Sequence, residues 1–80
     1  MSVIVYTRAR CHLCHEATRL LVAFGLKPRE VDIDQDPELM ARYTDSIPVV
    51  EINGRIRFRG EVNPILLRRI VAAEFSDRGD

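Results

Sequence analysis

The sequence contains no tryptophan, only two cysteines and no excess of charge of either sign. Lysine plus arginine and aspartate plus glutamate number 12 each, so there is no general electrostatic attraction to nucleic acid or to an anionic membrane. No apolar run approaches the roughly 18 residues that a membrane span needs. The segment Met1–Ile4 also lacks the positive charge and long apolar stretch of a signal peptide. We therefore expect a cytoplasmic protein that binds neither nucleic acid nor membranes.

Linkers, internal repeats and low-complexity segments are also missing from this chain of 80 residues. A chain of this length forms one small domain, near the lower limit at which a single core suffices without disulfides or metals. Hydrophobic residues make up 46% of the sequence, which is enough to fill such a core. We expect one domain over residues 1–76 and a polar tail over residues 77–80.

Two cysteines, Cys11 and Cys14, lie three residues apart where an apolar strand is followed by an amphipathic helix. The strand is the unbroken apolar run Val3–Tyr6, which is typical of a buried central strand. Apolar residues then recur at helical spacing, at Leu13, Ala17, Leu20, Leu21 and Phe24. Gly25 fits the end of this helix. Both cysteines therefore lie at a helix N-terminus, where unpaired N–H groups and the helix dipole stabilise a thiolate. This arrangement indicates a thioredoxin-like redox site.

The next segments predict a second strand and two further helices. A strand is expected over Arg29–Ile33. Because a helix separates it from the first strand, the two strands should be parallel with a right-handed crossover. Asp36–Pro37 combines an N-cap residue with proline at the first helical position, and it should begin a short helix that reaches Tyr43. Asn63–Pro64 repeats this signal for a last helix through Phe75.

A β-hairpin is predicted around Asn53–Gly54, the strongest short hairpin signal, which joins Val49–Ile52 to Ile56–Phe58. In the second of these strands Ile56 and Phe58 alternate with three arginines, Arg55, Arg57 and Arg59. This alternation predicts an edge strand with one solvated face. The element order is strand, helix, strand, helix, strand, strand, helix. It predicts an α/β fold in which a four-stranded mixed sheet has helices on both faces.

Five short motifs occur in order along the chain: Tyr6-Thr7-Arg8, Cys11 to Cys14, Asp32-Ile33-Asp34, Asp36 to Leu39 and Ile47-Pro48-Val49. With this pattern the chain resembles the glutaredoxins of the thioredoxin-fold superfamily, in particular the small bacterial glutaredoxin-like proteins. The resemblance covers nearly the whole chain. It implies a thiol–disulfide oxidoreductase in which Cys11 attacks a disulfide and Cys14 resolves the mixed disulfide.

The resemblance also implies roles for residues around the cysteine pair. Pro48 is implied to be a cis-proline that faces the cysteines, and the backbone of Ile47 is implied to pair with a bound peptide or glutathione. Arg8 is implied to bind the glycyl carboxylate of glutathione. The family's Gly-Gly and acidic motif is replaced here by Arg59-Gly60-Glu61-Val62-Asn63. This difference predicts weak binding of the γ-glutamyl end of glutathione.

Further expectations concern substrates and partners. The substrates are expected to be protein disulfides or small mixed disulfides, and the electrons to come from glutathione or a flavin-dependent reductase. No bound cofactor is expected; glutathione would serve as a co-substrate, and the protein should be a monomer.

His12 and His15 each directly follow a cysteine, and we expect both to be neutral residues that tune the pair rather than general bases. The run Cys11 to His15 also matches the haem-attachment pattern, but the chain lacks the secretory signal that usually accompanies it. A zinc or iron–sulfur centre needs about four ligands, and one chain offers two thiols, so such a centre would be shared between chains. The alternatives are therefore a metal or cluster carrier and a redox-sensing binding module.

Overall fold

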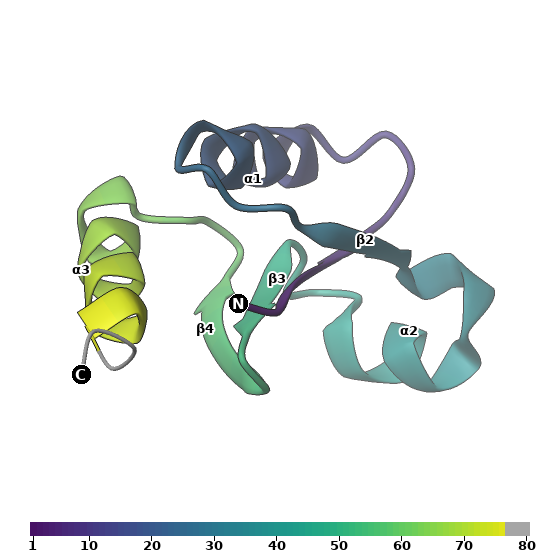
Figure 1. The fold of residues 1–80 in the computed structure, drawn as a ribbon. Helices are drawn as coiled ribbons and strands as arrows, with labels where there is room; N and C mark the ends of the chain where they lie inside the picture. Colours follow the sequence, from purple (N-terminus) through teal and green to yellow (C-terminus); the bar gives the residue numbers. More distant parts are fainter. Residues whose placement is uncertain (77–80) are drawn as a thin grey trace.

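A computed structural model describes residues 1–76; the expected tail at residues 77–80 lies outside the described residues. The elements of the described part, in chain order, are β1 (Val3–Thr7), α1 (His12–Ala23), β2 (Arg29–Asp32), the short 3-10 helix η1 (Ile33–Gln35), α2 (Pro37–Tyr43), β3 (Val49–Ile52), β4 (Arg55–Arg59) and α3 (Pro64–Ser76). Figure 1 shows their arrangement. None of the helices within residues 1–76 has the length and apolarity to cross a membrane.

The four strands form one mixed sheet in the order β2-β1-β3-β4. β1 pairs with β2 in parallel, with Val5 opposite Glu30, and with β3 in antiparallel, with Val5 opposite Val50. β3 and β4 form the antiparallel hairpin. The predicted central position of β1, the parallel β1–β2 pair and the edge position of β4 are all confirmed.

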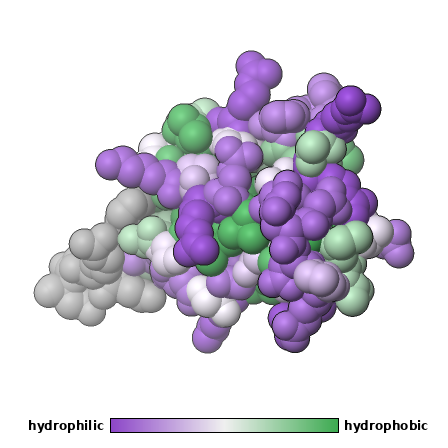
Figure 2. Space-filling model, turned by 90° about the vertical axis from the view of Figure 1, so that its right-hand side faces the viewer, coloured by the Kyte–Doolittle hydropathy of each residue, from purple (hydrophilic) through white to green (hydrophobic). Residues whose placement is uncertain are grey.

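The two faces of the sheet carry separate cores. Under α1 and α3 lies a core of Val3, Val5, Ala17, Leu21, Leu26, Val50, Ile52, Phe58, Val62, Leu67 and Ile70. On the other face a smaller core of Ile33, Tyr43 and Val49 lies between the sheet and α2. Helices thus cover both faces, as predicted (Figure 1). On the side where α2 lies, hydrophilic residues cover most of the surface and hydrophobic residues show only in small areas (Figure 2).

Local sequence signals set the ends of the helices. Asp36 caps α2, because its carboxylate accepts a hydrogen bond from the backbone N–H of Glu38 at 2.9 Å. Asn63 caps α3 in the same way, with the N–H of Ile65 at 2.9 Å. Gly25 follows α1 with a φ of 83°, a conformation that glycine adopts without steric cost. These three helix boundaries confirm the sequence predictions.

The second strand is shorter than predicted. β2 ends at Asp32, and Ile33 begins η1 instead of continuing the strand. The turn is fixed by the Asp32 carboxylate, which accepts a hydrogen bond from the backbone N–H of Asp34 at 2.9 Å. Ile33 is fully buried in the core beneath α2. Its apolar side chain therefore belongs to η1, and not to the strand that the alternation predicted.

The strict alternation expected in β4 is also wrong. Phe58 pairs with Val50, whereas Ile56 pairs with Glu51, the next residue of β3. Arg57 is therefore the additional residue of a β-bulge. As a result Phe58 packs in the core under α1 and α3, while Ile56 packs against the core on the α2 face. The arginines of β4 thus do not all line one solvated face.

Candidate active site

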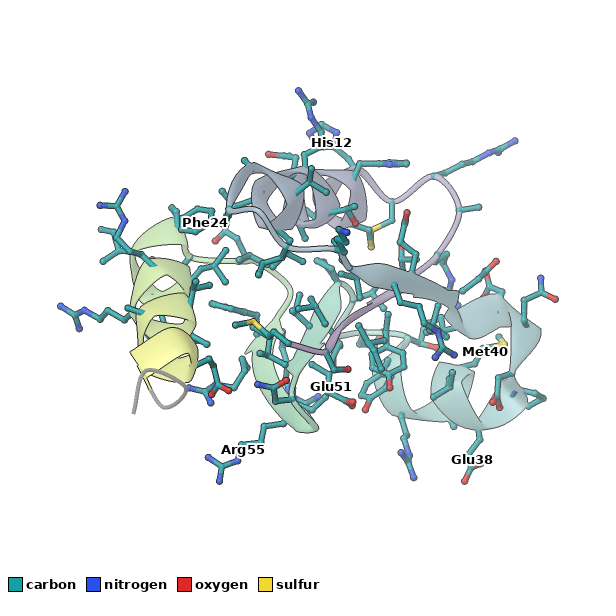
Figure 3. All side chains as sticks on the ribbon, in the orientation of Figure 1. His12, Phe24, Glu38, Met40, Glu51 and Arg55 are labelled. Atoms are coloured by element: carbon teal, nitrogen blue, oxygen red, sulfur yellow. A yellow bond between two sulfur atoms is a disulfide. The ribbon has the colours of Figure 1, made fainter. Side chains whose placement is uncertain are left out.

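Cys11 and Cys14 form a disulfide at the start of α1, with their Cα atoms 5.2 Å apart (Figure 3). Cys11 is the N-cap residue and has extended backbone angles, whereas Cys14 lies in the first helical turn. Cys14 is only 2% exposed, while Cys11 is partly exposed. The sulfur of Cys11 is therefore the one that a substrate can reach more easily.

The helix N-terminus supplies a hydrogen-bond donor to this sulfur. The backbone N–H of Cys14 donates to Sγ of Cys11 over 3.2 Å. The preceding residue, Arg10, has a φ of 63°, which turns the chain from the loop after β1 into the helix. When the disulfide opens, the same N–H and the positive end of the helix dipole favour the thiolate of Cys11. A thiolate here acts as nucleophile in one direction of exchange and as leaving group in the other.

The peptide bond between Ile47 and Pro48 is cis, which confirms the conformation implied by the family resemblance. Pro48 is buried and begins the turn into β3, and Ile47 is half-buried. The carbonyl of Pro48 accepts a hydrogen bond from the N–H of Gly60 at 2.8 Å, which ties this turn to the segment after β4. That Pro48 faces the cysteines and that Ile47 pairs with a substrate stay predictions.

The two histidines lie on the exposed side of α1. His12 is paired with Glu16 one turn along the helix, with 2.7 Å between Nε2 and Oε2. Figure 3 shows His12 at the outer side of α1, away from the sheet. His15 is also exposed. The role of both residues in tuning the disulfide stays a prediction.

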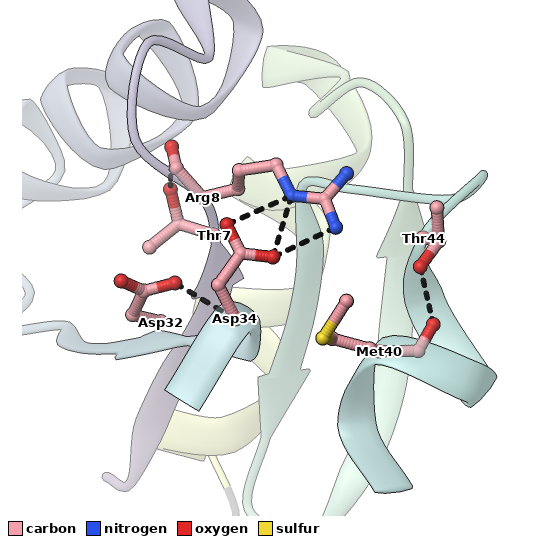
Figure 4. Close-up of polar contacts among 6 residues, drawn as sticks. All are labelled: Thr7, Arg8, Asp32, Asp34, Met40 and Thr44. Carbon is pink, nitrogen blue, oxygen red and sulfur yellow. Dashed lines mark hydrogen bonds and ion pairs between the residues drawn. The ribbon is translucent and has the colours of Figure 1, made fainter. Parts of the chain in front are cut away.

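Arg8, the basic residue expected to bind substrate, is engaged by an acid of this chain. Its Nε lies 3.0 and 3.1 Å from the two carboxylate oxygens of Asp34, and its Nη2 lies 2.8 Å from Oδ1 (Figure 4). Hydrogen bonding to Asp34 raises the pKa of the Arg8 guanidinium. Sequence reasoning missed this pair because the two residues are 26 positions apart. In the sequence Asp34 stands out only as part of a motif.

A pocket of about 470 Å³ opens between α1 and the segment that follows β4. It is lined by Leu13, Glu16, Ala17, Arg19, Leu20, Ala23, Glu61 and Val62. Leu13, which lies between the two cysteines, is 47% exposed. The prediction that Leu13 belongs to the core face of the helix is therefore wrong; the residue forms part of the surface beside the disulfide.

A polar aromatic cluster lies on the opposite face of the sheet, against α2. The hydroxyl of Tyr6 donates to Oε1 of Glu51 over 3.3 Å, and the rings of Tyr6 and Tyr43 have centroids 4.9 Å apart. The guanidinium of Arg59 lies 5.9 Å from the Tyr43 ring centroid. Burial raises the pKa of Tyr6, and the negative charge of Glu51 raises it further. This cluster joins β1, β3, β4 and α2.

Metal binding is an alternative use of the two cysteines. Within residues 1–76 there is no group of three or more histidine, cysteine, aspartate or glutamate side chains placed to hold a metal ion. Zinc and iron–sulfur sites need more ligands than the two thiols supply.

Comparisons with known proteins agree on one family. Residues 2–72 match the family model described as "Glutaredoxin-like domain (DUF836)". The chain is 31% identical to Glutaredoxin-C1 of Oryza sativa subsp. japonica over 64 residues, which cover 69% of this chain and 62% of that protein. The chain thus spans about three fifths of the length of this relative.

Solved structures show the same fold. The target protein XcR50 from X. campestris is 30% identical with a TM-score of 0.78, and the match covers 90% of this chain and 97% of that one. The E. coli protein NrdH-redoxin is 26% identical with a TM-score of 0.67, over 86% of this chain and 93% of that one. It is described as a glutaredoxin-like protein with a thioredoxin-like activity profile. These similarities confirm the thioredoxin-like fold.

Proposed function

Since this chain belongs to the glutaredoxin-like domain family, we propose that it is a thiol–disulfide oxidoreductase that works through Cys11 and Cys14. The observation that carries the proposal is the disulfide at the N-terminus of α1, with one accessible and one buried cysteine. In the proposal the protein acts in the cytoplasm as a monomer and contributes to cell redox homeostasis.

The proposed reaction transfers two electrons from the reduced pair to a substrate disulfide. The thiolate of Cys11 forms a bond to one substrate sulfur as the substrate S–S bond breaks, and the other substrate sulfur leaves and takes up a proton. Cys14 then loses its proton and attacks Sγ of Cys11. This step forms the protein disulfide and releases the second substrate thiol. The buried position of Cys14, beside the Cys11 sulfur, supports its resolving role.

Substrate binding is proposed to involve the cis-proline turn. In this proposal Pro48 forms a wall of the substrate groove, and the backbone N–H and C=O of Ile47 pair with an extended peptide. The pocket beside Leu13, which has both apolar and charged lining residues, is proposed as a second contact for a polypeptide substrate. We propose no bound cofactor, and His12 and His15 are proposed to tune the potential of the disulfide rather than to transfer protons.

The physiological reductant is proposed to be a flavin-dependent reductase rather than glutathione. Directly after β4 the chain has one glycine, Gly60, followed by Glu61, which differs from the Gly-Gly and acidic motif of glutaredoxins. The similar protein NrdH-redoxin has a thioredoxin-like activity profile. Both points support reduction of protein disulfides, with glutathione as a slow co-substrate.

Single serine variants test the proposed function. The wild type should accelerate insulin reduction by dithiothreitol, and Cys11→Ser should reduce this to the level of the double variant Cys11→Ser/Cys14→Ser. Cys14→Ser keeps the nucleophile but lacks the resolving thiol, so it should accumulate a mixed disulfide visible by intact-mass spectrometry. Equal inactivity of both single variants, with no adduct on Cys14→Ser, would contradict an exchange mechanism and support metal binding or redox sensing.

A further inference from the structure

Arg8 lies on the loop between β1 and the disulfide, three residues before Cys11, and its guanidinium is bound side-on by a single carboxylate. Nε and Nη2 both contact Asp34, at distances between 2.8 and 3.1 Å (Figure 4). This paired geometry is the one in which a guanidinium binds a carboxylate most strongly. The two side chains are 29% and 39% exposed, so the pair is accessible from solvent.

Asp34 is held in place by the fold. Its backbone N–H donates to the carboxylate of Asp32 at 2.9 Å, in the short helix η1 that follows β2. Hydrogen bonding to Asp34 is the main cause of the raised pKa of Arg8, and desolvation partly offsets it. The negative charges of Asp34, Asp32 and Asp45 raise this pKa further. Asp45 precedes the cis-proline turn by two residues. The guanidinium of Arg8 therefore has three carboxylates near it, those of Asp32, Asp34 and Asp45.

We propose that Asp34 is a specificity-determining residue: by binding Arg8, it makes the dithiol discriminate against small disulfides that carry a carboxylate. This inference rests on the proposed oxidoreductase function. A carboxylate beside the substrate sulfur would bind a free guanidinium through charge-assisted hydrogen bonds. With Asp34 in place, that carboxylate must displace an acid already held by the chain and meets charge of its own sign. An uncharged disulfide neither has to displace Asp34 from Arg8 nor is repelled by its negative charge.

The discrimination is measured with two small disulfides of similar size. One is the disulfide of mercaptopropionate, which carries a carboxylate on each half, and the other is the disulfide of mercaptoethanol, which carries a hydroxyl. Protein reduced with dithiothreitol and then desalted supplies two electrons per molecule, and each turnover yields two substrate thiols and one protein disulfide. The rate for the carboxylate disulfide divided by that for the hydroxyl disulfide removes any change in the reactivity of Cys11.

Asp34→Ala should raise this ratio about two- to fivefold, because releasing a solvent-exposed ion pair changes an affinity only modestly. Asp34→Asn should give a smaller rise, because its amide oxygen still accepts a hydrogen bond from Arg8. The matched control is Glu30→Ala, which removes an exposed acid from β2 and should leave the ratio unchanged. Far-ultraviolet circular dichroism and thermal unfolding verify that each variant is folded.

A variant that lacks the Arg8 guanidinium provides the decisive control. In Arg8→Ala protein, adding Asp34→Ala should no longer change the ratio, because there is no guanidinium to release. A ratio unchanged in both Asp34 variants would overturn the inference. A rise that persists without Arg8, or that Glu30→Ala reproduces, would also overturn it, since the effect would then be one of net charge. Failure of the wild type to react with either disulfide would instead overturn the proposed function.

Discussion

At the scale of single residues, Cys11 and Cys14 differ in surroundings although one helical turn separates them. Cys11 is the N-cap residue and accepts a hydrogen bond from a backbone N–H, while Cys14 is 2% exposed. The difference arises because the N-cap residue stands outside the helix and the third residue of the helix turns back toward the sheet. The two thiols of the reduced protein should therefore differ in reactivity.

Alkylation tests this difference. In reduced protein at neutral pH, iodoacetamide should modify Cys11 at least about tenfold faster than Cys14, because helix N-termini favour the thiolate and burial limits access. Peptide mass mapping after short labelling times measures both rates. Cys11→Ser and Cys14→Ser, each with a single thiol, serve as reference proteins for the two rates. Equal labelling of both cysteines would contradict the assignment of Cys11 as the attacking residue.

At the scale of elements, the α2 face of the sheet depends on contacts that join separate strands. Tyr6 in β1 reaches Glu51 in β3 through its hydroxyl and the ring of Tyr43 at the end of α2. Burial and the charge of Glu51 raise the folded-state pKa of Tyr6 above its usual value of 10.0. The contribution of this hydroxyl to stability is therefore complete below the unfolded-state pKa and is lost as the pH rises through the folded-state pKa.

Tyr6→Phe should reveal this contribution. The wild type should exceed the variant in free energy of unfolding by less than about 1 kcal/mol at neutral pH, because the bond is partly exposed. The difference should shrink as the pH rises above 10, where the wild-type tyrosine ionises. Urea denaturation of both proteins across the alkaline range measures it, and other ionising groups cancel in the comparison. A difference independent of pH would contradict the role of the hydroxyl.

The β-bulge in β4 places the two apolar side chains of this strand on opposite faces of the sheet. With Arg57 as the additional residue, Ile56 packs against the α2-side core and Phe58 enters the core under α1 and α3. The edge strand therefore contributes to both cores. Bulges increase the local twist of an edge strand and disfavour pairing with another chain.

At the scale of the whole molecule, a chain of 80 residues is expected to have a small free energy of unfolding. Typical values per residue give a total of about 4–12 kcal/mol. Most of the burial is in the core between the sheet and the helices α1 and α3, where Leu21 has no exposed surface. Because both cysteines lie at the N-terminus of α1, this core also holds the site in place.

Leu21→Ala should cost about 2–5 kcal/mol, the range for leucine-to-alanine changes in packed cores. The melting temperature should fall by about 4–8 °C per kcal/mol for a domain of this size. Val22→Ala is the control, because the adjacent side chain is 56% exposed and alanine favours the helix. Thermal unfolding monitored by circular dichroism compares the two. A similar fall in both variants would show that α1 is not anchored by Leu21.

The sequence by itself determined the features that depend on neighbouring residues. Asp36 and Asn63 cap their helices, Gly25 ends the first one, and the Asn53–Gly54 turn joins the hairpin, as local hydrogen bonding and backbone freedom dictate. The cysteine pair at the start of α1 is predictable for the same reason, since a strand followed by an amphipathic helix places it there. The cis conformation at Pro48 came from the family resemblance and not from its own residues.

Only the tertiary structure decided the features that depend on residues far apart in the chain. Arg8 meets Asp34 because β1 and β2 lie side by side in parallel, so the residues that follow each strand come together. Leu13 is exposed because no element covers that side of the first helical turn within residues 1–76. The β4 bulge follows from packing Ile56 and Phe58 into different cores. Periodicity along the sequence carries no information on such pairings, because they arise when separate elements pack together.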